Sequence, residues 1–224
     1  MISNLLMATG SQAPISTVDL LDPFGDGSGV ALYKFDGDAT DTGGAFNGTA
    51  SNVTYTTGKF GQCGVFNGSS SKVQLPQEVF QSTGAVSVSV WFNTVNKAVD
   101  GFDEFMFSKR NGILTFCIWI NTEGKVQVVN WDRQTLTSLL PKTDGIWHNA
   151  IFTLENNNGK LYIDGILEVT YNSMTIYTQS FASANSIGSF DNYARYFSGS
   201  IDQVRIFNRA LTATEVTALY NEGQ

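Results

Sequence analysis

Carboxylates gather after the first apolar run of the chain and are the first residues that could do chemistry. Asp36, Asp38 and Asp41 fall within six residues, in a loop rich in Asp, Thr and Gly. Such a loop could hold Ca²⁺, which takes about six to eight hard oxygen ligands. It is not an EF-hand, because its sixth position is Asp41 and its twelfth is Asn47, where that motif needs Gly and Glu. The alternative is a solvated turn whose aspartates accept hydrogen bonds from their own backbone.

Two other segments combine aromatic rings with polar side chains, as sugar-binding sites do. One contains Trp131 and Arg133, and the other contains Tyr193, Arg195 and Tyr196. We take these five residues as the candidate ligand-binding set. The alternative is that the rings plug the edges of the fold, with each ring buried and each hydroxyl in water.

Catalytic groups are not expected in this sequence. A glycosidase needs two carboxyl groups about 5 to 9 Å apart, but the glutamates of this sequence are scattered. Asp103 and Glu104 are adjacent, so they would face opposite sides of a strand. His148 is the single histidine, and a lone histidine supports neither a catalytic triad nor a zinc site.

Composition excludes one class of partner. The 224 residues carry a formal net charge of −7, which repels nucleic acid. An acidic surface suits neutral glycans, cations or a basic partner, or simply keeps the protein from self-association. Cys63 and Cys117 both fall in expected strands. We expect buried free thiols, with a disulfide as the alternative.

Short β-rich runs separated by turn residues must position these groups. The hydrophobic fraction of 42% suits a single sandwich with a full core. Asp164-Gly165 between two such runs predicts a hairpin. The expected strands are residues 30–35, 61–67, 72–75, 86–91, 105–109, 113–120, 125–131, 146–154, 160–163, 166–171 and 186–189. This pattern predicts an all-β fold, a two-sheet antiparallel jelly-roll sandwich.

The last segment predicts a strand followed by one short C-terminal helix. Thr212 stands three residues before Glu215, the spacing of a capping box. Val216, Leu219 and Tyr220 then form one apolar stripe at helical spacing.

This segment, GSIDQVRIFNRALTATEVTALY, resembles the end of laminin-G-like jelly rolls of the concanavalin A-like lectin/glucanase superfamily. The resemblance covers roughly residues 29–222. Earlier segments agree in the expected order: ALYKFDG at residue 31, FGQCGVFNG at 60, VSVSVWF at 86, Trp147-His148, and LYIDG at 161. The resemblance implies a structural calcium ion near the first loop and the terminal strand, with Asp41, Asn47 and Asp202 as ligands. Glucanases of this superfamily carry paired carboxylates within one strand, and this sequence lacks that motif.

The first 28 residues predict an N-terminal arm or linker before a jelly-roll domain at residues 29–224. Apolar residues in this arm, such as Ile15, Leu20 and Phe24, suggest docking on a neighbouring subunit, and a disordered leader is the alternative. The first ten residues lack the charge and apolar run of a secretion signal, and no run is apolar enough to span a membrane.

Similar sandwiches occur among bacteriophage structural and tail proteins. We therefore expect a non-enzymatic virion surface or tail protein, made in the host cytoplasm, that binds host glycans or another surface receptor. The arm would contact other virion proteins or a second copy of the chain. The alternatives are a bacterial extracellular carbohydrate-binding module and a purely structural capsid-decoration or fibre subunit.

Overall fold

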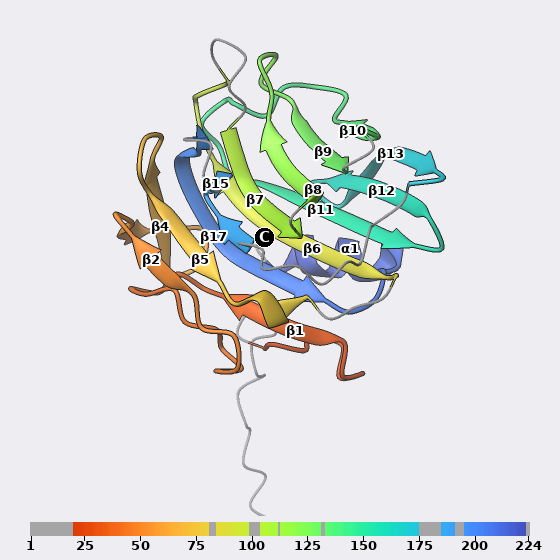
Figure 1. Cartoon of the computed structure of the whole chain (residues 1–224), viewed down its shortest axis with the longest axis horizontal. Coiled ribbons are helices and arrows are strands. Elements are labelled where there is room, and N and C mark those ends of the chain that lie inside the picture. Colours follow the sequence, from red (N-terminus) through yellow and green to blue (C-terminus); the bar gives the residue numbers. More distant parts are fainter. Residues whose placement is uncertain are drawn as a thin grey trace, which may run out of the picture.

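The fold is a two-layer β-sandwich with one short helix, as the sequence predicts. The computed structural model describes residues 20–80, 84–98, 104–111, 113–130, 133–174, 185–190 and 195–222. Figure 1 shows the two sheets as stacked layers, with α1 behind the layer that contains β6, β11 and β17. Within the described residues, every strand pairing is antiparallel.

One sheet has eight described strands and carries the helix on its outer face. Its order along the sheet is β13-β12-β11-β6-β17-β4-β3, and β1 pairs with part of β17. The strands are β1 Gly29–Tyr33, β3 Thr54–Thr57, β4 Gln62–Asn67, β6 Val86–Asn93, β11 His148–Glu155, β12 Asn158–Ile163, β13 Ile166–Asn172 and β17 Ser198–Phe207.

The second sheet has seven described strands, in the order β10-β9-β8-β7-β14-β5-β2. A two-stranded ribbon of β15 and β16 accompanies it, and a 3₁₀ turn, η2, spans Gln77–Val79. The strands are β2 Thr49–Ser51, β5 Lys72–Leu75, β7 Glu104–Asn111, β8 Ile113–Ile120, β9 Val126–Asn130, β10 Thr135–Thr137, β14 Asn185–Ile187, β15 Ser189–Phe190 and β16 Arg195–Tyr196.

The core lies between the sheets because alternate side chains of each strand point inward. Phe92 and Phe152 from one sheet and Phe107 and Phe116 from the other are fully buried there. The Asp164-Gly165 hairpin is confirmed: φ is 53° and 78°, the left-handed pair that a two-residue type I′ turn needs. The two cysteines are buried free thiols.

Helix α1, Ala213–Asn221, begins at the predicted cap. The Thr212 side chain accepts from the Glu215 backbone, and the Glu215 carboxylate accepts from the Thr212 backbone, an arrangement that stabilises a helix start by about 1 kcal/mol. Val216 and Leu219 are buried against Ile151 and Phe207 of the eight-stranded sheet. No helix in the described part of the chain is long and apolar enough to span a bilayer.

The described end of the predicted arm, residues 20–28, contacts the sandwich. The Phe24 ring lies 5.8 Å from the Phe207 ring, and the carboxylate of Asp26 pairs with Arg209 at 2.6 Å. The Ser28 carbonyl accepts a backbone hydrogen bond from Asn208. The division into an arm and a domain at residue 28 stays a prediction, and residues 1–19 lie outside the described part.

Candidate functional site

A row of side chains crosses the outer face of the seven-stranded sheet. Ile118 and Ile120 of β8 point into the core, so Trp119 between them points outward. In the strand registers Trp119 is paired with Phe105 of β7 and Gln127 of β9. Gln127 is in turn paired with Thr137 of β10. Four neighbouring strands therefore place one aromatic and polar row on this face.

Two hydrogen bonds hold this row in place. The Trp119 indole N–H donates to the Gln127 side-chain oxygen at 2.8 Å. The Gln127 amide nitrogen then donates to the Thr137 hydroxyl at 2.9 Å. All three residues are half-buried, so the indole is fixed in orientation and still partly open to solvent. A fixed ring beside amide and hydroxyl groups is the combination that stacks on a sugar and bonds its hydroxyls.

The ribbon of β15 and β16 bounds the row on the β7 side. The Phe190 ring stacks on Phe105 at 4.7 Å, and Phe105 meets Trp119 edge-on at 4.8 Å. Arg195 and Tyr196 form β16 and are both half-buried. The structure thus brings these two predicted ligand-binding residues to the border of the row. Tyr193 lies outside the described residues.

Arg133 borders the face at the turn between β9 and β10. It is exposed, adopts a positive φ of 58°, and its backbone N–H donates to the Asn130 carbonyl. Trp131 lies outside the described residues. The sequence missed Trp119, Gln127 and Thr137. Ile118, Trp119 and Ile120 are all apolar, so they show no alternation that would place Trp119 on the outer face.

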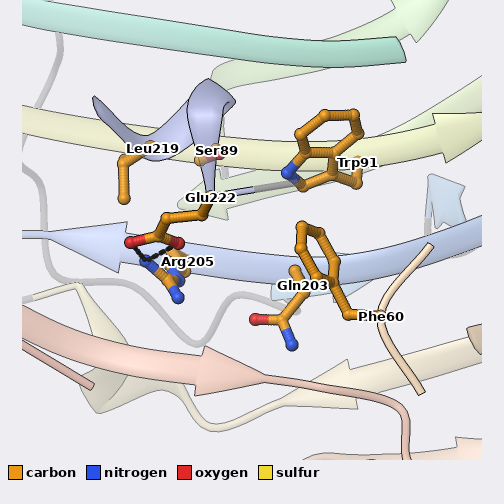
Figure 2. Close-up of a pocket in the computed structure, with 7 residues that line it drawn as sticks. All are labelled: Phe60, Ser89, Trp91, Gln203, Arg205, Leu219 and Glu222. Carbon is orange, nitrogen blue, oxygen red and sulfur yellow. Dashed lines mark hydrogen bonds and ion pairs between the residues drawn. The ribbon is translucent and has the colours of Figure 1, made fainter. Parts of the chain in front are cut away.

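A small pocket opens on the opposite side of the molecule, on the outer face of the eight-stranded sheet. Figure 2 shows the Phe60 and Trp91 rings on one side and the Arg205–Glu222 ion pair on the other. The pair has a nitrogen to oxygen distance of 3.1 Å. The Trp91 ring also stacks on Tyr220 of α1, at 5.7 Å and 12°. The other lining residues are Ser89, Gln203 and Leu219.

The calcium ligands expected from the resemblance occupy two different environments. The carboxylate of Asp41 accepts from four backbone N–H groups, those of residues 32, 43, 45 and 46. These bonds use its lone pairs, so a cation would have to displace them. Asn47 lies beside it, and its side-chain oxygen accepts from the Asp41 backbone.

Asp202 fits a cation better than Asp41 does. One carboxylate oxygen accepts from the Phe60 backbone, and the other is buried without a partner. Burial raises the pKa of Asp202 to about 7, and the charge of Asp36 adds to that rise. Among the described residues, however, no cluster of three or more His, Cys, Asp or Glu side chains could hold a metal ion. Calcium binding stays a prediction.

His148 belongs to a charged cluster at the start of β11. Its ring nitrogens contact Asp164 at 2.8 Å and Asp144 at 3.1 Å, and Lys142 lies 3.6 Å from Asp164. Burial opposes the charged ring, but both carboxylates outweigh it and raise the pKa of His148. The cluster ties the Asp164-Gly165 turn to the loop before β11.

Comparison with known proteins identifies the family to which this chain belongs. Residues 67–217, about two thirds of the chain, match the family described as the concanavalin A-like lectin/glucanases superfamily. The chain belongs to this superfamily. No protein of curated function matches the sequence.

Solved structures of this superfamily's fold include glycan-related proteins. Domain 4 of AbnA, a GH43 extracellular arabinanase from Geobacillus stearothermophilus solved with arabinotriose, is 24% identical with a TM-score of 0.71, covering 85% of this chain and 97% of its own. Botulinum neurotoxin type C, a toxin whose cell entry depends on interaction with two ganglioside molecules, gives a second similar structure. It is 19% identical with a TM-score of 0.63, and the match covers 83% of this chain and 48% of the neurotoxin chain.

The Trypanosoma rangeli sialidase, solved with the inhibitor DANA, is 12% identical with a TM-score of 0.66, covering 85% of this chain and 32% of its own. This chain spans about half of the neurotoxin chain and about a third of the sialidase chain. At these identities the likeness concerns the fold.

Proposed function

We propose that the chain is a non-enzymatic carbohydrate-binding domain whose site is the Trp119–Gln127–Thr137 row. The observation that carries the proposal is the half-buried indole, held by the 2.8 Å bond to Gln127. Sugar rings present C–H faces that pack on indole, and their hydroxyls bond to amide and hydroxyl groups. Arg195 and Tyr196 border the row and Arg133 borders the same face, and these residues would contact the outer units of an oligosaccharide. The arabinotriose complex of AbnA domain 4 supports this class of ligand.

The proposal excludes glycoside hydrolysis at this row. Trp119, Gln127 and Thr137 carry no carboxyl group, whereas glycosidases use a pair of them. Glu104 is next to Phe105 in the sequence, accepts a 3.3 Å hydrogen bond from the Ser198 backbone and has a pKa raised by burial. A single carboxyl group does not supply the pair that hydrolysis needs. Reducing-end release from arabinans or β-glucans, lost on mutation of a single Asp or Glu, would contradict this part.

A glycan array followed by calorimetry with the best ligand tests binding. Trp119→Ala should weaken binding at least about fivefold, since aromatic contacts of this kind contribute about 1 kcal/mol or more. Trp147→Ala is the matched control, because Trp147 is also half-buried but directly precedes β11 of the other sheet. Equal binding by both variants would show that the row is not the site.

The setting that we propose is adhesion by a virion surface or tail protein, with an extracellular bacterial module as the alternative. This part rests on the resemblance to phage proteins alone. Mass spectrometry of purified virions, together with the genes beside this one, tests it. Neighbouring polysaccharide-degrading genes in place of capsid and tail genes would favour the bacterial module.

A further inference from the structure

Strand β13 forms one edge of the eight-stranded sheet. It is paired with β12 and with no other described strand, and Figure 1 shows it at the right-hand border of the molecule. Strand β10 of the other sheet lies close to it, but side chains bridge the two segments. Gln134 donates to the Ser173 carbonyl, and Glu168 accepts from the Leu139 backbone. Among the described residues, no backbone hydrogen bond uses the outer edge of β13.

The composition of β13 differs from that of the opposite edge of the same sheet. β13 has seven residues, ILEVTYN, without Lys or Pro, whereas the opposite edge strand β3 has four residues, TYTT. Edge strands are usually short or carry Lys or Pro, because an open row of N–H and C=O groups pairs with other chains. The bulge against β12 lies at Glu168, so residues 169–172 form a regular strand. This stretch can therefore pair with a further strand.

Exposed apolar side chains gather beside this edge. Six large apolar side chains are exposed in the described part of the chain, and four of them belong to the start of β13 or to the loop that Glu168 holds against it. These four are Leu139, Leu140, Ile166 and Leu167, and Ile166 is 68% exposed. Single exposed apolar residues are ordinary, but a group of them marks a contact surface.

A second copy of the chain fits this edge in charge. The protein carries a formal net charge of −7, so two copies can approach closely only where the contact holds few charges. Glu168 is the only charged residue of β13. When two β13 strands run antiparallel and are centred on Thr170, Glu168 faces the uncharged Asn172 of the second copy. The contact then brings no two carboxylates of β13 opposite each other.

The same register is also complementary in side-chain type. Val169 and Tyr171 both pack against the core between the sheets, and each would lie opposite the other across the two-fold axis. Thr170 would face Thr170 of the second copy. Aromatic rings opposite β-branched side chains, and threonines opposite each other, are favourable cross-strand pairs.

We propose that two copies of the chain associate through antiparallel pairing of β13 with β13, centred on Thr170. Their eight-stranded sheets would join into one continuous sheet, and the apolar side chains beside the edge would be covered. The inference does not depend on the proposed function, because no residue of the Trp119 row belongs to β13.

Sedimentation velocity over a concentration series tests the association. The wild type should form dimers, and Thr170→Lys should raise the dimer Kd about fivefold or more, because two like charges would then oppose each other. Lys160, which is paired with Thr170 on β12, adds to this repulsion. Thr56→Lys is the matched control, since Thr56 is also an exposed threonine, on the edge strand at the other end of the sheet. A monomer at every concentration, or equal Kd values for the two variants, would overturn the proposal.

A cysteine variant tests the register and does not rely on the lysine variant being folded. Residues opposite each other in an antiparallel pair have Cα atoms about 4.5 to 5.5 Å apart, a distance that a disulfide spans. Thr170→Cys should therefore give a covalent dimer under mild oxidation, and Thr56→Cys should not. Cys63 and Cys117 are buried, so they should not cross-link. A Thr170→Cys protein that stays monomeric on a non-reducing gel, or equal cross-linking of both variants, would refute pairing centred on Thr170.

Discussion

The Asp202 carboxylate accepts a 2.9 Å hydrogen bond from the Phe60 backbone, although the two residues are 142 positions apart. The bond fixes the segment before β4 against β17, next to the Trp91 ring. The second oxygen of Asp202 is buried without a hydrogen-bond partner, and burial of the carboxyl disfavours its charged form. The carboxyl at this connection therefore keeps its proton to a higher pH than a solvated aspartate does.

Stability should fall as the pH rises from about 4 to about 7. Burial raises the folded pKa of Asp202 to about 7, against about 3.9 in an unfolded chain. Between these values the folded state binds the extra proton, so raising the pH favours unfolding. Asp202→Asn keeps an oxygen for the Phe60 N–H without a charge. In urea titrations with chelator, the unfolding free energy of the variant should increase relative to that of the wild type by a few kcal/mol between pH 4 and pH 7. Parallel curves would contradict the assignment.

Calcium, if it binds, should act through Asp202. A cation would supply the missing charge, and binding only to the folded state at a hundredfold excess over Kd adds about 2.7 kcal/mol. Calcium should then raise the Tm of the wild type above its value in chelator, and Asp202→Asn should abolish the difference.

Asp41→Asn provides the matched comparison. It replaces a carboxylate oxygen that accepts backbone N–H groups by a donor, so it should cost about 1 to 3 kcal/mol in calcium and chelator alike. A Tm that ignores calcium in all three proteins would show that the ion has no site here.

Local chemistry explains which parts of the fold the sequence could predict. Asp164-Gly165 and the Thr212–Glu215 box each determine a structure within a few residues, and both are confirmed. Thr49–Ser51 and Thr54–Thr57 escaped prediction because most of their side chains are exposed. Without a buried face, a strand shows no alternation to read.

The candidate site depended on register, which the sequence does not carry. Residues 113–120 were predicted as a strand. Because this run is apolar, the sequence did not show whether the Trp119 side chain faces the core or the outer surface. Thr137 lies on a three-residue strand that gave no signal. The pocket forms beside a β-bulge at Gln203. The Asp41 carboxylate accepts from four backbone N–H groups, and the sequence shows neither arrangement.

His148 should titrate above its ordinary value of about 6.5. Burial lowers its pKa, but Asp164 and Asp144 raise it further than burial lowers it. The cluster therefore stabilises the fold below pH 6.5, and this contribution is lost as the pH rises through the folded pKa. The single histidine gives one ring signal in ¹H NMR, which reports its pKa directly.

Substitution of the two aspartates identifies the stronger partner. Asp164→Asn should lower the pKa of His148 more than Asp144→Asn, because the Asp164 side chain is 22% exposed and that of Asp144 is 52% exposed. Asparagine tolerates the positive φ of residue 164, so the turn should survive. A larger effect from Asp144→Asn would reverse this assignment.

Gln127 should act as a positioning residue for glycan binding. Its side chain accepts from the Trp119 indole and donates to the Thr137 hydroxyl, so it fixes the ring across two strands. Gln127→Met keeps the volume but releases both partners. Each lost bond is worth about 1 kcal/mol, and both freed groups stay partly solvated, so unfolding free energy should fall by no more than about 1 to 2 kcal/mol.

Glycan affinity should respond differently in the two neighbouring variants. If orientation of the indole matters, Gln127→Met should weaken binding about tenfold in calorimetry, although the ring itself is retained. Thr137→Val removes only the last hydroxyl of the row and leaves the Trp119–Gln127 bond in place, so its loss should be smaller. Binding that survives Gln127→Met but is lost in Thr137→Val would mean that the hydroxyl contacts the sugar and that the indole needs no anchor.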